Sequence, residues 1–154
     1  MKTYKSTISP RLSLTAIKIC KWASEETMCF TANICLDGKK AGDVRNDGHG
    51  GCHEMHFSNN DALELLKSDA KAMGDYEAFG MILSRDVEDL IDIMVAEFEA
   101  RKHAKKYFTF INDDEGDSIE TFSSLKQGGK KVRNDHPGIA RFAAQNNITV
   151  VEAN

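Results

Sequence analysis

The residues best suited to chemistry in this 154-residue chain lie between Val44 and Phe57, where the sequence reads VRNDGHGGCHEMHF. These fourteen residues contain three glycines, three of the five histidines, one of the four cysteines and an Asn-Asp pair. An ordinary connection between two elements needs only a few turn-forming residues. The stretch is therefore the first place to look for a metal-binding or ligand-binding site.

Metal binding is one hypothesis for this stretch, because imidazole and thiolate are the usual ligands of zinc and similar ions. The candidate ligands are His49, Cys52, His53 and His56, with Asp47 as a further oxygen donor. Their spacing differs from that of dedicated zinc sites, and no matching half-site occurs elsewhere in the chain. Zinc or another divalent metal is therefore an alternative, and the main expectation is that the protein needs no cofactor.

The glycines support a second hypothesis, in which the backbone itself binds a ligand. Glycines in series expose N–H groups and let a ligand approach closely, while neighbouring polar side chains add directed hydrogen bonds. The candidate ligand-binding residues in this stretch are Asn46, Asp47, Gly48, Gly50 and Gly51. Their spacing matches neither the P-loop nor the dinucleotide-binding glycine motif, so it does not identify the ligand.

Two further interpretations remain open. In the first, the glycines and the Asn-Asp pair only build a turn that requires positive φ, and the histidines lie half exposed. In the second, Cys52 is a nucleophile with His53 or His56 as its base, although adjacent side chains of an extended chain point to opposite faces. The sequence therefore assigns no catalytic residue.

Three antiparallel strands are expected to precede and position this stretch. Period-2 alternation of apolar and polar residues predicts the first strand over 15–22 and the second over 28–36. Asp37-Gly38 then favours a type I′ turn, because both central positions of that turn require positive φ, so that 39–45 returns as the third strand. The residues of the second strand expected on one face are Phe30, Ala32, Ile34 and Leu36.

After the stretch the apolar period changes to that of helices. A helix capped by Asn59 or Asn60 is expected to end at Gly74. The clearest helix spans 85–106, with Ser84 as its N-cap and acidic residues in its first turn. The apolar stripe expected to pack on the sheet consists of Val87, Leu90, Ile91, Met94, Val95 and Phe98.

The remaining expected elements are strands over 107–111, 118–124 and 148–151 and a short helix over 137–146. Residues 75–83 fit no single pattern. The fold class predicted is α+β, with a mainly antiparallel sheet packed against one long amphipathic helix and shorter helices. We expect one domain over 1–154, with residues 1–13 as an arm or an edge strand.

Charge and composition limit the partners. The formal net charge of −4 and the pI near 5.7 give no overall attraction to nucleic acid or anionic membrane. No apolar run approaches 18 residues and no signal peptide is recognisable, so a cytoplasmic protein with reduced cysteines is expected. Two basic segments, 101–106 and 126–133, could form a patch for phosphates, but solvation alone explains most such charges, and no sequence-specific nucleic-acid binding is expected.

One pattern in the first third of the chain carries a resemblance. Its parts, in order, are Trp22-Ala23-Ser24-Glu25-Glu26-Thr27, Cys29-Phe30, Asp37-Gly38-Lys39 and Asn46-Asp47-Gly48-x-Gly50-Gly51. The pattern spans about 17–57 and resembles a family of small uncharacterised proteins of bacteriophages and bacteria. The resemblance implies a phage-type accessory protein in the host cytoplasm that binds a host protein or a small, nucleotide-like ligand to counter host defence. It adds Trp22, Glu25 and Thr27 to the ligand-binding candidates.

Three functions follow, in order of preference. The first is a non-enzymatic binding protein that uses the loop over 46–56, with 22–27 nearby. The alternative is a metal-dependent hydrolase or nuclease with His49, Asp47, His53 and His56 in its site. The second alternative is a scaffold that forms homo-oligomers through an apolar face left exposed by the long helix. Trp22 itself is expected to bury its ring in the core or at its rim, as large aromatic side chains usually do.

Overall fold

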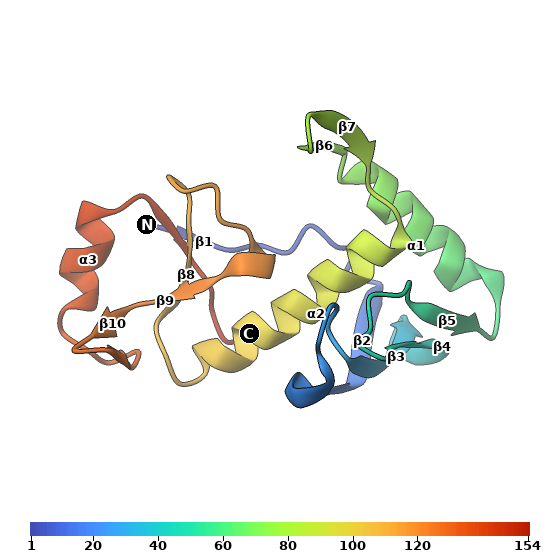
Figure 1. Ribbon diagram of the computed structural model, residues 1–154, viewed down its shortest axis with the longest axis horizontal. Helices are drawn as coiled ribbons and strands as arrows, with labels where there is room; N and C mark the ends of the chain where they lie inside the picture. The colour runs from blue at the N-terminus through green and yellow to red at the C-terminus, as the bar shows by residue number, and fades with distance from the viewer. The chain divides into compact units, whose positions relative to one another are not determined.

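The computed structural model of the protein describes residues 1–154 and confirms the α+β class, with 29% helix and 34% strand (Figure 1). The contacts divide the chain into two compact units, Thr7–Met94 and a second unit made of Met1–Ser6 and Val95–Asn154. Instead of the single sheet expected, the strands form two four-stranded sheets and two separate hairpins. None of the helices combines the length and the apolar character that crossing a membrane requires.

The unit Thr7–Met94 contains a fully antiparallel sheet in the order β2-β3-β4-β5. Its strands are β2 (Leu12–Ile19), β3 (Phe30–Leu36), β4 (Lys39–Asn46) and β5 (Glu54–Phe57). The first three form the predicted meander. The fourth lies inside the glycine- and histidine-rich stretch, where no strand was predicted, because its alternating residues are few and follow directly on helix- and strand-breaking glycines.

The turn between β3 and β4 has the predicted geometry. Asp37 has φ 51° and Gly38 has φ 77°, so both central residues lie in the left-handed region that a type I′ turn requires. The face assignment for β3 is confirmed for Phe30, Ala32 and Ile34, which are buried. It fails at the end of the strand, where the register shifts after Ile34, so that Cys35 is buried and Leu36 only half-buried. Burying a large side chain such as Phe30 contributes roughly 1.5–3 kcal/mol before entropy is counted, so this face anchors the sheet.

Helix α1 (Asn60–Ala72) packs against β3 and β5 through its apolar face. The side chain of Asn59 accepts a hydrogen bond from the N–H of Asp61 at 3.0 Å, which confirms Asn59 as the N-cap. Strands β6 (Asp75–Ala78) and β7 (Met81–Ser84) then form a hairpin in the segment that the sequence left unassigned.

Helix α2 (Val87–Ala104) is the long helix that the sequence predicts, with two differences. Its N-cap is Asp86 and not Ser84: the N–H of Asp89 donates to Asp86 Oδ1 at 3.0 Å and the N–H of Asp86 donates to Asp89 Oδ2 at 2.9 Å. The predicted stripe is also too narrow. Phe98 is 36% exposed, whereas Ile93 and Ala96 outside the stripe are buried.

The second unit contains a sheet in the order β1-β12-β8-β9. Its strands are β1 (Lys2–Thr3), β12 (Ile148–Val150), β8 (Thr109–Asn112) and β9 (Ser123–Ser124). The parallel pairing of β1 with β12 makes Lys2–Thr3 an edge strand, whereas the predicted arm over 1–13 overlaps β2 from Leu12 onward. The core of this unit contains Phe108, Phe110 and Ile148, against which Phe142 packs. Its other elements are η2 (Ile119–Thr121), β10 (Lys126–Gln127), β11 (Lys130–Lys131) and α3 (Ile139–Gln145).

The hairpin β6–β7 places an aromatic residue in a strained turn position. Phe79 has φ 54° and is 95% exposed. Phe79→Asn is expected to increase the free energy of unfolding by about 1 kcal/mol, because asparagine adopts the left-handed region more readily and little ring burial is lost. Urea denaturation measures the change. Ile82→Thr, at an exposed strand position of the same hairpin, serves as the control and should stay within about 0.5 kcal/mol. A destabilised Phe79→Asn variant would contradict the exposed position of the ring.

Candidate functional site

The candidate residues gather at one end of the sheet β2-β3-β4-β5. Ile19 at the end of β2 pairs with Phe30, and Phe30 pairs with Asn46 at the end of β4. The two connections that leave these strands, 20–29 and 47–53, therefore start from the same edge. The first contains a short 3₁₀ helix, η1 (Lys21–Ala23). We call residues 20–29 and 46–53 the clasp.

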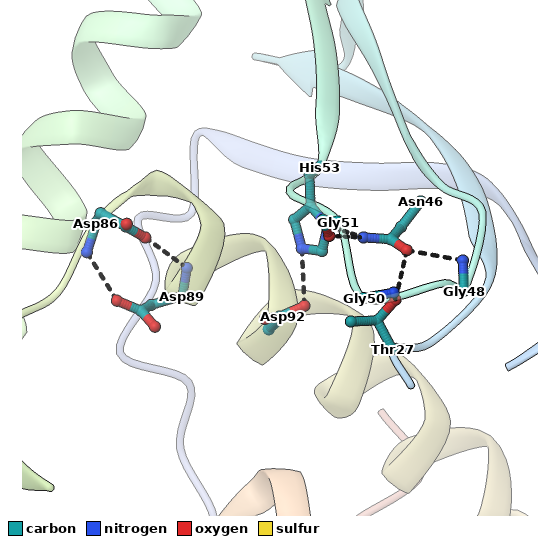
Figure 2. Close-up of polar contacts among 9 residues, drawn as sticks. All are labelled: Thr27, Asn46, Gly48, Gly50, Gly51, His53, Asp86, Asp89 and Asp92. Atoms are coloured by element: carbon teal, nitrogen blue, oxygen red, sulfur yellow. Dashed lines mark hydrogen bonds and ion pairs between the residues drawn. The ribbon is translucent and has the colours of Figure 1, made fainter. Parts of the chain in front are cut away.

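The side chain of Asn46 connects the two halves of the clasp (Figure 2). It is buried, and its Oδ1 accepts hydrogen bonds from Thr27 Oγ1 at 2.7 Å and from the N–H of Gly48 at 2.8 Å. Its Nδ2 donates to the carbonyl oxygen of Gly51 at 2.9 Å and to His53 Nδ1 at 3.1 Å. An amide side chain has two donor hydrogens and two acceptor lone pairs, so every hydrogen-bonding position of Asn46 is used.

The backbone of the clasp is closed by Gly48. Its carbonyl oxygen accepts hydrogen bonds from the N–H groups of Glu25, Glu26 and Thr27 at 3.1, 2.9 and 3.3 Å. Gly48 has φ 88°, and a Cβ atom at this position would lie 2.1 Å from the carbonyl oxygen of Ala23. Glycine is therefore required here both by conformation and by space.

Ser24 stabilises the first half of the clasp from within. Its hydroxyl donates to the carbonyl oxygen of Cys20 at 2.9 Å and accepts from the N–H of Cys29 at 2.8 Å. Together with Thr27, Asn46 and Gly48, Ser24 belongs to the pattern that carries the resemblance. These four residues have structural roles, so the structure explains much of that pattern without a ligand.

His53 occupies the centre of the site, with its side chain only 6% exposed and its ring edge-on to Phe30. Because Asn46 Nδ2 donates to His53 Nδ1, that nitrogen carries no hydrogen, and Nε2 donates to Asp92 Oδ1 at 2.8 Å. Burial works against the charged imidazole, but the hydrogen bond and charge of Asp92, together with Glu88 and Asp86, raise the pKa of His53 above its ordinary value.

The other candidate metal ligands do not contact His53 and have partners of their own. His49 Nδ1 lies 3.2 Å from Glu25 Oε2, and His56 Nδ1 lies 3.4 Å from Asp43 on the neighbouring strand. Cys52 is exposed. No group of three or more His, Cys, Asp or Glu side chains is arranged to hold a metal ion. Each of the three histidines contacts a different carboxylate, and no two of them share a set of metal ligands. Metal binding therefore stays a prediction.

The outer surface of the clasp presents the remaining candidates. Trp22 is 89% exposed, so the expectation that its ring is buried is wrong. The short helix η1 has no buried residue and turns the indole away from the core. The other exposed positions of the clasp are Lys21, Glu25, Glu26, Met28, Asp47, His49, Gly50, Gly51 and Cys52.

Sequence reasoning missed Asp92 and Ser24. Asp92 lies 39 positions after His53 in the sequence and contacts it only in the fold. It is a single carboxylate on a helix, so no local sequence pattern indicates its role. Ser24 had a signal, since serine in a turn commonly bonds to nearby backbone groups.

Comparison with protein-family models, with curated proteins and with solved structures found no match.

The role of Asn46 can be tested against that of its exposed neighbour. Asn46→Ala is expected to lower the free energy of unfolding by about 2–4 kcal/mol, because it leaves the buried N–H of Gly48 and the part-buried Nδ1 of His53 without their partner. Asp47→Ala removes one exposed hydrogen bond, from the N–H of His49, and should cost less than about 1 kcal/mol. Chemical denaturation compares the two variants. Equal losses of unfolding free energy in the two variants would show that the hydrogen bonds of Asn46 stabilise the fold no more than one exposed hydrogen bond does.

The electrostatics of His53 give a second test. Asp92→Asn is expected to lower the pKa of His53, because the carboxylate that favours the imidazolium is removed while burial remains. NMR titration of the histidine ring protons measures this, with His56 as the internal control that should not shift.

Since the folded-state pKa is raised, protonated His53 stabilises the fold below the ordinary histidine pKa, and this contribution is lost as the pH rises through the raised value. The stability difference between wild type and Asp92→Asn should therefore be larger on the acidic side. A pKa that does not change would contradict the Asp92 contact.

Proposed function

We propose that the chain is a non-enzymatic binding protein that recognises another protein through the outer surface of the clasp, centred on Trp22. The observation that carries the proposal is the exposure of this one tryptophan on a loop that a buried hydrogen-bond network holds rigid. An exposed indole gains nothing for the fold, whereas tryptophan is among the residues that contribute most to protein–protein interfaces.

A protein partner fits the clasp better than a phosphate-bearing ligand. The N–H groups of Glu25, Glu26 and Thr27, which lie in series and would otherwise attract an anion, all donate to Gly48. The N–H groups of Gly48 and Gly50 are bonded to side chains as well. Since these donors are occupied, recognition depends on side chains that point outward.

The charges beside Trp22 favour a particular kind of partner. Glu25, Glu26 and Asp47 are exposed around the clasp against one exposed cation, Lys21, so the surface carries a local excess of negative charge. We therefore expect an apolar pocket for the indole with basic residues at its rim. The resemblance to small bacteriophage and bacterial proteins supports a host protein, and specifically a defence protein in the host cytoplasm, as that partner.

Trp22→Ala should weaken partner binding by about 30-fold or more and leave the fold intact. Truncating a buried interface tryptophan commonly costs 2 kcal/mol or more, which weakens binding by about 30-fold, while an exposed ring adds little to stability. Affinity capture from host extract compares wild type, Trp22→Ala and the control Phe79→Ala, which removes another exposed aromatic ring. The partner should be retained by wild type and by Phe79→Ala and lost by Trp22→Ala.

Trp22 also reports on its own environment. Because the chain has one tryptophan, the fluorescence of the free protein should resemble that of an indole in water and shift to shorter wavelength when the captured partner is added. A captured protein that binds Trp22→Ala as tightly as wild type, or that leaves the emission unchanged, would contradict the proposal.

A further inference from the structure

The unit made of residues 1–6 and 95–154 carries a group of exposed cations that have no carboxylate partner. They are Lys105, Lys106, Lys126, Lys130, Lys131, Arg133 and Arg141. None of them takes part in an ion pair, whereas Arg11, Arg45 and Lys67 in the other unit each contact a carboxylate. Cations without an ion pair also occur in the other unit, for example Lys39 and Lys40, so the feature specific to these seven is that they gather on the segments 105–106, 126–133 and 141.

The hairpin β10–β11 brings two of these cations into direct opposition. Lys126 is the register partner of Lys131, and Gln127 is the partner of Lys130. Like charges placed directly across two strands destabilise the pairing. A short hairpin that keeps this repulsion gains stability from a bound anion.

Tyr107 lies at the point where separate basic segments meet. The Nζ atoms of Lys106 and Lys131 lie 5.2 and 5.7 Å from the centroid of its ring. Arg133 forms an isolated β-bridge with the same residue. Cations from the end of α2 and from the segment 130–133 therefore share one surface around an aromatic ring.

A hollow lies between this hairpin and helix α3, which are neighbours in Figure 1. The apolar side chains that line it are Leu125, Val132 and Phe142, and its polar lining includes Lys126, His136 and Arg141. An apolar floor with cations at its edge suits a ligand in which a flat apolar ring is attached to an anionic group.

We infer that this surface binds single-stranded nucleic acid without sequence preference. Phosphates lie against the lysines and arginines that make no ion pair, and an unstacked base enters the hollow beside Lys126 and Arg141. A duplex keeps its bases stacked and cannot fill the hollow, and an acidic peptide meets the cations but supplies no flat ring. The apolar floor reads no base edge, which makes the binding independent of sequence.

The test uses the full chain and a fluorescein-labelled oligothymidylate, with binding followed by anisotropy over a series of salt concentrations. Lys126→Gln/Lys130→Gln should weaken binding about tenfold at low salt and reduce the slope of log K against log salt by about 1.4, since each single-strand phosphate contact contributes about 0.7. Neither lysine makes a contact that the fold requires, and circular dichroism confirms folding. Arg141→Gln, at the edge of the hollow, should weaken binding separately.

The charge-matched control is Lys39→Gln/Lys40→Gln in β4, which removes the same charge from exposed positions of the other unit. It should leave the affinity and the salt slope unchanged. An abasic oligomer and a duplex of the same phosphate number should both bind more weakly, and polyglutamate should compete poorly. The inference is overturned if wild type does not bind at low salt, if both lysine pairs weaken binding equally, or if any of these three competitors matches the oligothymidylate.

Discussion

The fully bonded amide of Asn46 is the interaction on which the rest of the clasp depends. A buried amide that lacks even one partner pays the cost of desolvation without compensation, so the native state must place all four partners correctly at once. Those partners come from both connections, because Thr27 belongs to one and Gly48, Gly51 and His53 to the other. The network thereby joins two loops, of which only the second contains glycines, into one defined surface.

Local patterns predicted the parts of this fold that depend on local chemistry. The positive φ angles at Asp37-Gly38, the buried face of β3 and the cap at Asn59 each follow from one or a few neighbouring residues. The bonds of Asn46 and the contact between His53 and Asp92 join distant positions, and no local signal encodes them. The histidines consequently drew attention as metal ligands, while the asparagine that organises them looked like one turn residue among several.

The position of Trp22 shows why composition alone misleads about exposure. A large ring usually contributes most by burial, and the sequence offered no reason to expect otherwise. The connection 20–29 is held through Ser24, Thr27 and its own backbone, so the fold does not need the indole as an anchor. Because the fold does not depend on this side chain for stability, the exposed indole can serve recognition.

The two proposed surfaces differ in how they meet the entropic cost of binding. The clasp presents an aromatic side chain with only two rotatable bonds on a backbone whose donors are already occupied, so little conformational freedom is lost on contact and shape can determine the partner. The cations of β10–β11 are long, mobile side chains around a short hairpin, and their attraction to phosphate is screened by salt and indifferent to base identity. A rigid anchor therefore suits one defined protein, whereas unpaired mobile charge suits a repeating polyanion. The clasp suits a protein because its backbone donors are bonded within the clasp. The surface around β10–β11 suits a nucleic acid because its cations make no ion pair.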